Sequence, residues 1–282
     1  MEVLVATRDG VAGLEGRDVG ALAVDDGTVW AVVEGQEVWR RDGDWSLAAS
    51  WEGPMMTCLA ASDDGVIVGT TEAHLLRLDG QTLAIDESFD RLPERASWYT
   101  PWGGPASTRS IARDDEAVLV NVHVGGIARS EAGGPWRALV DIHVDVHQIA
   151  AAPDGSLLAA TGAAGFGRSI DDGATWRWDS DGLHGSYCRA VAVAGDQVLL
   201  TASTGPGGSQ GAVYRRPLGK EGTWQRVTDF AKGNIDTYWL AAAGDTAVYV
   251  SHDGALFMTA DAGSTWDHVS DFTAAPRAVA LM

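Results

Sequence analysis

The sequence predicts an all-β fold: a seven-bladed β-propeller built from four-stranded antiparallel blades. Three observations predict it. A short motif, an apolar residue followed by Ala, recurs seven times along the 282 residues. Six of the copies run into a turn that contains Asp, and a second apolar segment follows each turn. The chain also begins with a second strand that no first strand precedes, and it ends with a first strand that no second strand follows.

The repeated motif marks the first strand of each expected blade. Ala suits this innermost strand because neighbouring blades converge there and leave little room for a side chain. The seven copies are Leu22-Ala23, Leu59-Ala60, Ile111-Ala112, Ile149-Ala150, Val191-Ala192, Leu240-Ala241 and Val279-Ala280. The segments expected to form the second strands are Val29-Trp30, Val66-Ile67, Val118-Leu119, Leu157-Leu158, Val198-Leu199 and Val248-Tyr249.

The last blade is expected to combine the two ends of the chain. The segment from Arg277 to Leu281 supplies its first strand, and Val3-Leu4-Val5 supplies the second. Closing the ring in this way removes exposed sheet edges that would otherwise pair with other chains. The expected blades cover residues 19–50, 51–88, 89–141, 142–184, 185–230, 231–272, and 273–282 together with 1–18, so that 1–282 forms one domain.

Composition and charge exclude some partners. Hydrophobic residues make up 45% of the chain, enough for a large core, and the formal net charge is −19. An acidic surface repels phosphate groups, so we expect no binding to nucleic acid or to an anionic membrane. The first ten residues, MEVLVATRDG, lack the pattern of a signal peptide, and no run of 18 apolar residues occurs. We therefore expect a cytoplasmic monomer, with Cys58 and Cys188 as buried thiols.

Two segments carry the pattern Ser/Thr-x-Asp-x-Gly-x-Thr-Trp. They run over 169–176 and 259–266, and their key residues are Asp171, Gly173 and Trp176, and Asp261, Gly263 and Trp266. The Asp carboxylate can accept hydrogen bonds from its own turn, Gly can adopt a positive φ, and Trp can pack over the hairpin. We assign these six residues a structural role rather than a catalytic one.

These segments resemble Asp-boxes, also called BNR repeats. The chain is similar to bacterial BNR/YVTN-type propellers and, more distantly, to sialidases and photosystem II assembly-factor-like proteins. In such families the Asp-box lies between the third and fourth strands of a blade, away from the active face. The resemblance implies a fold and does not name a reaction.

A ligand site is expected at the mouth, the end of the propeller where each first strand begins and where second and third strands are joined. Arg109, Arg189 and Arg277 occupy equivalent places in the repeat, two residues before the apolar residue of the motif, and suit a carboxylate or phosphate ligand. Aromatic and polar residues of the neighbouring loops complete the expected binding set: Trp98, Tyr99, Trp102, Asn121, His123, Asn234 and Tyr238. For each Arg, a structural ion pair with an Asp of the next blade is an alternative, for example between Arg189 and Asp145 or Asp236.

Catalysis or metal binding at the mouth would depend on a second set of residues. The candidate catalytic residues are His147, His184, Tyr187 and Asp236, because histidine and tyrosine side chains can act as general acids or bases toward a bound substrate. His123, His147 and His184 are candidate ligands for a divalent metal, although their spacing carries no metal signature and the cofactor stays open.

Two function classes remain. The first is a binding propeller whose mouth holds a small anion or a protein or peptide partner. The second is a hydrolase or lyase at the same mouth, for which Asp18, Asp145 and Asp236 are candidate carboxylates of a glycosidase. Sialidase chemistry is disfavoured, because the only near match to the required Arg-Ile-Pro motif, Arg91-Leu92-Pro93, lies in mid-chain.

Overall fold

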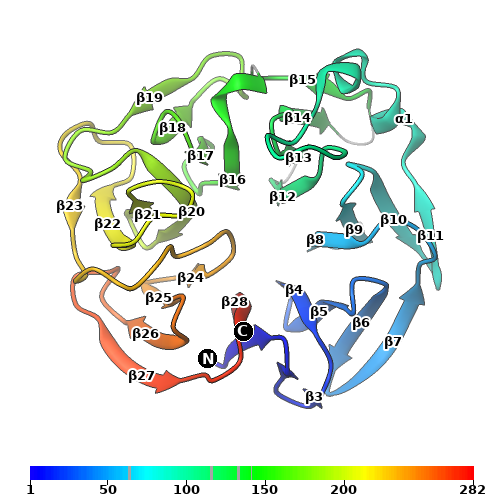
Figure 1. Cartoon of the computed structure of the whole chain (residues 1–282), viewed down its shortest axis with the longest axis horizontal. Helices are drawn as coiled ribbons and strands as arrows, with labels where there is room; N and C mark the ends of the chain where they lie inside the picture. The colour runs from blue at the N-terminus through cyan, green and yellow to red at the C-terminus, as the bar shows by residue number, and fades with distance from the viewer. Residues whose placement is uncertain (63–64, 115–116, 132–133, 141) are drawn as a thin grey trace. The chain divides into compact units, whose positions relative to one another are not determined.

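The computed structural model describes residues 1–62, 65–114, 117–131, 134–140 and 142–282. In these residues the strands form seven antiparallel sheets of four strands each, the blades of an all-β propeller (Figure 1). The fold class expected from the repeat is therefore confirmed. The sheet β28-β1-β2-β3 joins the last strand of the chain to the first, as expected from the unpaired strands at the two ends.

The strands follow the sequence repeat blade by blade. The early blades contain β4 (Val19–Asp25), β5 (Thr28–Val33), β6 (Glu37–Asp42) and β7 (Asp44–Ser50); β8 (Met56–Ser62), β9 (Gly65–Thr70), β10 (Leu75–Asp79) and β11 (Thr82–Ile85); and β12 (Thr108–Arg113), β13 (Ala117–Val122), β14 (Gly126–Glu131) and β15 (Arg137–Ala138). The later blades contain β16 (Val146–Ala151), β17 (Leu157–Thr161), β18 (Phe166–Ser169) and β19 (Arg177–Asp179); β20 (Tyr187–Ala194), β21 (Gln197–Ser203), β22 (Ala212–Pro217) and β23 (Gln225–Arg226); and β24 (Leu240–Ala243), β25 (Thr246–Val250), β26 (Ala255–Thr259) and β27 (Asp267–Asp271). The remaining blade contains β28 (Pro276–Leu281), β1 (Val3–Thr7), β2 (Gly10–Val11) and β3 (Leu14–Glu15).

Helical structure is confined to short connecting segments. These are α1 (Glu87–Asp90) and the 3-10 helices η1 (Pro93–Ser97) and η2 (Ile142–Val144). The carboxylate of Asp86 caps α1 by accepting hydrogen bonds from the backbone N–H groups of Ser88 and Phe89. None of the helices in the described ranges has the length and apolar character that crossing a bilayer requires.

The backbone contacts divide the chain into two compact units. Unit 1 comprises Met1–Val5 and His147–Leu281, and unit 2 comprises Ala6–Val146 and Met282. Within each unit the core lies between the faces of adjacent blades. In unit 1, for example, Leu158 and Phe166 of one blade pack with Leu200 and Tyr214 of the next. Each such side chain contributes about 1.5–3 kcal/mol through burial, which makes the contact between blades the main source of stability.

The two Asp-x-Gly turns of unit 1 form the same hydrogen bonds. In the turn after β18, Asp171 accepts hydrogen bonds from the Ser169 hydroxyl at 2.8 Å and from the Thr175 N–H at 2.9 Å. In the turn after β26, Asp261 accepts the equivalent bonds from Thr259 at 2.7 Å and from Thr265 at 2.9 Å. The hydrogen bond from the Thr265 backbone and those from the Thr259 and Thr265 hydroxyls lower the pKa of Asp261 to about 2.

This pKa predicts how the turn contributes to stability. We expect Asp261→Asn to lower the melting temperature at neutral pH, because the neutral amide accepts these hydrogen bonds less strongly. A lowered native pKa stabilises the fold above the carboxyl's ordinary pKa of 3.8, and this contribution is lost as the pH falls from there toward 2. The difference between wild type and variant should therefore narrow over that range in a pH series of thermal melts. The exposed Asp267→Asn, in the same blade, is the control; equal melting curves for both variants would contradict the role of Asp261.

Candidate functional site

Four first strands are distorted at the position that the sequence placed at the mouth. The pairing register shifts between Val19 and Ala21, between Met56 and Cys58, between Thr108 and Ser110, and between Cys188 and Val191. The shifts enclose Gly20, Thr57, Arg109 and Arg189, the residues at equivalent places in the repeat. A β-bulge turns a side chain away from the regular alternation of a strand and is frequent beside binding sites. The sequence placed Arg109 and Arg189 at this position but gave no sign of the bulges.

Arg189 of unit 1 is an anchor for its neighbouring loops. Its Nη1 forms an ion pair with Asp236, and its Nη2 donates a hydrogen bond of 3.1 Å to the carbonyl of Pro206. Asn234 donates to the same carbonyl at 3.1 Å. The Gly-rich loop 203–211 is therefore held by two side chains of the predicted site. The ion pair with Asp236 is one of the two pairings that the sequence left open, and it reduces the capacity of Arg189 to clamp an anion.

His147 and Tyr187 continue this group in unit 1. The ring of Tyr187 lies between the Arg189 guanidinium, at 5.3 Å, and the ring of His147, at 4.9 Å. His147 is fully buried, and its Nδ1 is 2.7 Å from the carbonyl oxygen of Cys188. A carbonyl accepts only, so Nδ1 carries a proton that it donates to this oxygen. Three of the four candidate catalytic residues, His147, Tyr187 and Asp236, thus join one chain of contacts through Arg189.

The structure places His184 in different surroundings. Its Nδ1 is 2.7 Å from the Tyr214 hydroxyl, and its ring packs against Phe230 at 4.8 Å. Burial lowers the pKa of His184, so the ring is neutral near pH 7. Aromatic neighbours of this kind favour a packing role.

The remaining predicted residues of unit 1 shape the backbone. Tyr238 has a φ of 62° and donates its N–H to Gln148 at 3.1 Å, just before β24. Arg277 accepts a hydrogen bond from the Trp239 indole at its carbonyl, at 3.0 Å. Arg277 also takes part in further interactions, and so does Arg109 of unit 2.

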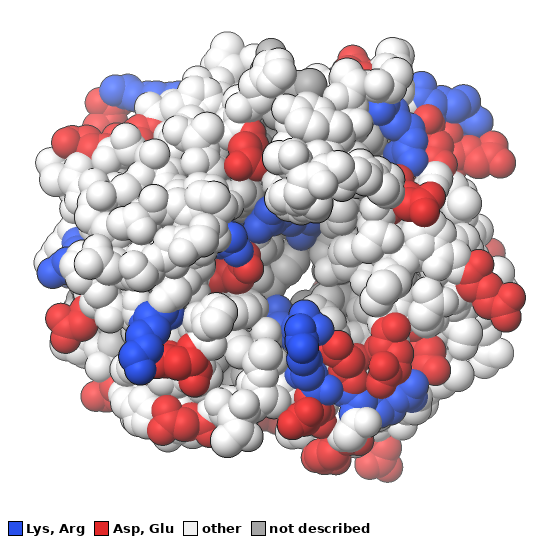
Figure 2. Space-filling model, in the orientation of Figure 1, with Lys and Arg blue, Asp and Glu red and all other residues white. Residues whose placement is uncertain are grey.

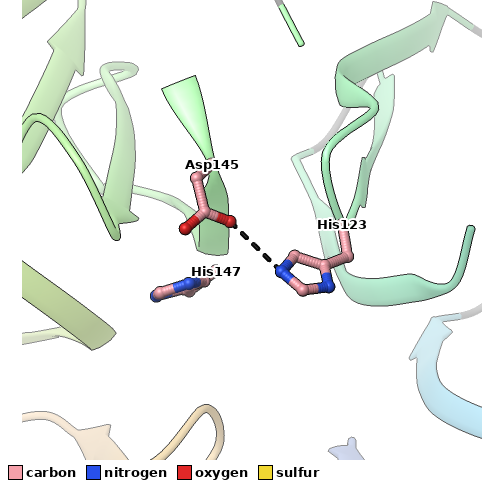
Figure 3. A group of neighbouring side chains, drawn as sticks. All are labelled: His123, Asp145 and His147. Atoms are coloured by element: carbon pink, nitrogen blue, oxygen red, sulfur yellow. Dashed lines mark ion pairs between the residues drawn. The ribbon is translucent and has the colours of Figure 1, made fainter. Parts of the chain in front are cut away.

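In unit 2, His123 forms an ion pair with Asp145. Its Nε2 is 3.2 Å from Oδ1 of Asp145, and its side chain is 7% exposed. Asp145 has a φ of 53°, an unusual backbone conformation for a residue other than glycine. Figure 3 shows the pair together with His147, which follows Asp145 by two residues in the chain. A carboxylate beside an imidazole can orient the ring for proton transfer or supply oxygen and nitrogen ligands to a metal.

Asn121 is committed to holding this part of unit 2 together. It is fully buried, donates to the carbonyl of Val146 at 2.7 Å and accepts from the Ser110 hydroxyl at 3.0 Å. These bonds attach the start of β16 to β13, so Asn121 positions Asp145 through the backbone. The ligand-binding role expected for Asn121 stays a prediction, and its amide already makes these two hydrogen bonds.

The aromatic segment 97–107 of unit 2 divides into a partly buried tryptophan, Trp98, and an exposed turn. Trp98 packs on Phe89 with ring centroids 5.5 Å apart and lies under the Arg95 guanidinium at 5.6 Å. Trp102 is 75% exposed and Tyr99 is 44% exposed. The ring of Trp102 nonetheless contacts the His123 ring, with centroids 4.8 Å apart. Trp102 is therefore exposed to solvent while one part of its ring is supported by the buried His123.

A tight turn holds Trp102 in this exposed position. The hydroxyl of Thr100 donates to the carbonyls of Gly103 and Gly104, at 2.9 and 3.2 Å. Gly103 and Gly104 have φ values of 84° and 101°, which residues with a Cβ rarely adopt.

Figure 2 shows that acidic side chains gather over the blade of β4–β7, with a few basic ones among them.

No protein-family model and no curated protein sequence matches this chain. Solved structures with the same fold include virginiamycin B lyase from Staphylococcus aureus with quinupristin, at 14% identity and a TM-score of 0.68, covering 95% of this chain and 87% of that one. YCF48 bound to the D1 peptide has 15% identity and a TM-score of 0.59, with 93% and 81% covered. The GH74 xyloglucanase of Xanthomonas campestris has 15% identity and a TM-score of 0.62, with 89% and 45% covered. At these identities the likeness shows the propeller fold alone, which serves lyases, a glycoside hydrolase and a peptide-binding protein.

Proposed function

We propose that this protein is a binding propeller that holds a segment of a partner protein against Trp102 and Tyr99. One observation carries the proposal: Trp102 is 75% exposed, while its ring packs on His123, which is buried and paired with Asp145. A large aromatic side chain that is fixed in place loses little entropy on binding, and such residues dominate the energy of protein interfaces.

The chemistry of the surface favours an apolar, basic peptide segment. Pro101 and Pro105 are also exposed, so the turn 99–105 presents four apolar or aromatic side chains to solvent. The formal net charge of −19 attracts a positively charged partner before contact. YCF48, a propeller of the same fold, is solved with a peptide bound, which supports this kind of partner.

A small anion at the mouth, our other expectation, has weaker support. Arg189 is paired with Asp236, and Arg109 and Arg277 also have partners. The guanidinium of Arg189, already paired with a carboxylate, gains less from a carboxylate or phosphate ligand. A hydrolase or lyase centred on His147 is a second candidate, favoured by the Cys188 carbonyl that sets its tautomer and by the chain of contacts to Asp236.

Selection of peptides from a random display library on the immobilised protein tests the proposal. We expect the selected peptides to carry apolar and basic residues and to bind Trp102→Ser at least about 30-fold more weakly than wild type, the effect of losing a hot-spot aromatic residue. The melting temperature should stay unchanged, because the side chain is exposed. Ile170→Ser removes an equally exposed apolar side chain from unit 1 and is the matched control. Peptides that bind Trp102→Ser as tightly as wild type would refute the proposal.

A further inference from the structure

Unit 1 contains a cavity of about 440 Å³ that takes no part in the proposed function. It lies between the segment 227–232, which follows β23, and the blade of β24–β27. Its wall includes four aromatic residues, Phe230, Tyr249, Phe257 and Trp266. This volume lies in the range of sites that bind small organic molecules.

The aromatic rings of this cavity support one another. Tyr249 stacks on Phe257 with centroids 4.9 Å apart and meets the edge of Trp266 at 5.0 Å. Tyr249 is only 3% exposed, so neighbouring residues restrict its rotation. Phe230, which is 41% exposed, already carries the guanidinium of Arg226 over its ring at 4.3 Å. A cation therefore already lies over one of the aromatic rings that line this cavity.

The charged groups of the cavity are mainly acidic. The carboxylates of Asp229 and Asp253 line it, and Asp253 accepts a hydrogen bond of 2.6 Å from the Ser251 hydroxyl. Lys232 also lines the cavity; it is 87% exposed, and its ammonium lies 3.9 Å from Asp253. Burial raises the pKa of Tyr249 against the opposing effect of its hydrogen bond with Thr228, and the charges of Asp229 and Asp253 add to the rise, so its phenol stays neutral.

From this combination we infer that the cavity binds an organic cation of the quaternary or methylated ammonium class. The faces of aromatic rings attract a cation whose hydration is weak, and the carboxylates Asp229 and Asp253 complement its charge. A hydrated metal ion would need several oxygen or nitrogen ligands in place of the aromatic wall. An anion would be repelled by both carboxylates and by the net charge of −19.

Calorimetric titration with choline, compared with 3,3-dimethylbutan-1-ol, tests the inference. The alcohol has the shape of choline with carbon in place of the charged nitrogen, so a difference between the two isolates the charge. We expect choline to bind at least about tenfold more tightly, the scale of a cation against desolvated aromatic faces. Equal binding of the two molecules, or no binding of choline, would overturn the inference.

Two variants locate the binding. Phe257→Leu keeps an apolar side chain but removes the aromatic face, and Asp253→Asn removes one charge while nearly keeping the shape. Each is expected to weaken choline binding about three- to tenfold without changing the affinity for the alcohol. Asp267→Asn makes the same charge change in the same blade outside the cavity and should leave binding unaltered. If Asp253→Asn and Asp267→Asn behave alike while both keep the wild-type melting temperature, this cavity is not the site.

Discussion

Replacing Phe89 by alanine is expected to lower the free energy of unfolding by about 3–5 kcal/mol, the largest effect of any single change considered for this protein. Phe89 has no exposed surface and lies in α1, where its ring packs on Trp98 at 5.5 Å and on the edge of Trp136 at 5.0 Å. Removing the ring leaves a cavity between two indoles that cannot close without moving the loops that carry them. Urea denaturation of both proteins measures the difference.

The same change also tests how Trp102 is supported. Trp98 packs on Phe89, and only three residues separate Trp98 from Trp102, so peptide binding should weaken with Phe89→Ala. Ile85→Ala, a truncation of a 40% exposed side chain in β11, is the control and should change stability by less than about 0.5 kcal/mol. A loss below about 1 kcal/mol for Phe89→Ala would show that α1 and the aromatic segment do not depend on this packing.

Replacing Asp179 by asparagine is expected to cost about 2–4 kcal/mol, because it leaves the charge of Arg216 without its partner inside the protein. Arg216 is 9% exposed, and its guanidinium lies 4.3 Å from the Trp224 ring and 5.3 Å from the Phe166 ring. Its Nη1 donates to Asp179 and, at 2.9 Å, to the Gly222 carbonyl. The carbonyl alone cannot neutralise the guanidinium, so the variant should show a lower urea midpoint.

The pH dependence of this effect has a defined sign. Burial alone would raise the pKa of Asp179, but hydrogen bonds from the Asp181 N–H and from Arg216 outweigh it and lower the pKa below 3.8. The pair therefore stabilises the fold above pH 3.8, and this stabilisation is lost as the pH falls through the lowered native pKa.

An exposed ion pair of the same unit provides the control for Asp179→Asn. Arg177 and Glu221 form an ion pair with side chains 71% and 72% exposed, so Glu221→Gln should cost less than about 0.5 kcal/mol. Equal losses for Asp179→Asn and Glu221→Gln would mean that burial of Arg216 adds nothing to the strength of its pair.

Much of the fold could be predicted from the sequence, because the motifs that specify it are local and repeated. Six of the apolar-Ala motifs, each with its Asp turn, specify one strand pair each, and the seventh motif at the end of the chain completes the number of blades. The unpaired strands at the two ends predicted the sheet that joins β28 to β1. The Asp171 and Asp261 turns followed from residue types at fixed spacing, since every hydrogen bond involved lies within one turn.

The candidate site was harder to predict from the sequence, because its contacts join distant parts of the chain. The sequence gathered His147, Tyr187 and Asp236 at one end of the blades, but it included His184, which packs on Tyr214 and Phe230. It also offered two partners for Arg189, and only the positions of separate blades select Asp236. No pattern within the segment 97–107 distinguishes the partly buried Trp98 from the exposed Trp102.

The sequence by itself determined the fold class, the number of blades and the position of each first strand. Those properties follow from hydrophobic periodicity and turn chemistry, which act over a few residues. Only the tertiary structure decided which carboxylate pairs with Arg189, which tryptophan faces solvent and where four aromatic rings line an acidic cavity. Each of these depends on the packing of residues that are distant in sequence, such as Phe89 beneath Trp98 and Asp236 beside Arg189, and packing is a property of the folded chain as a whole.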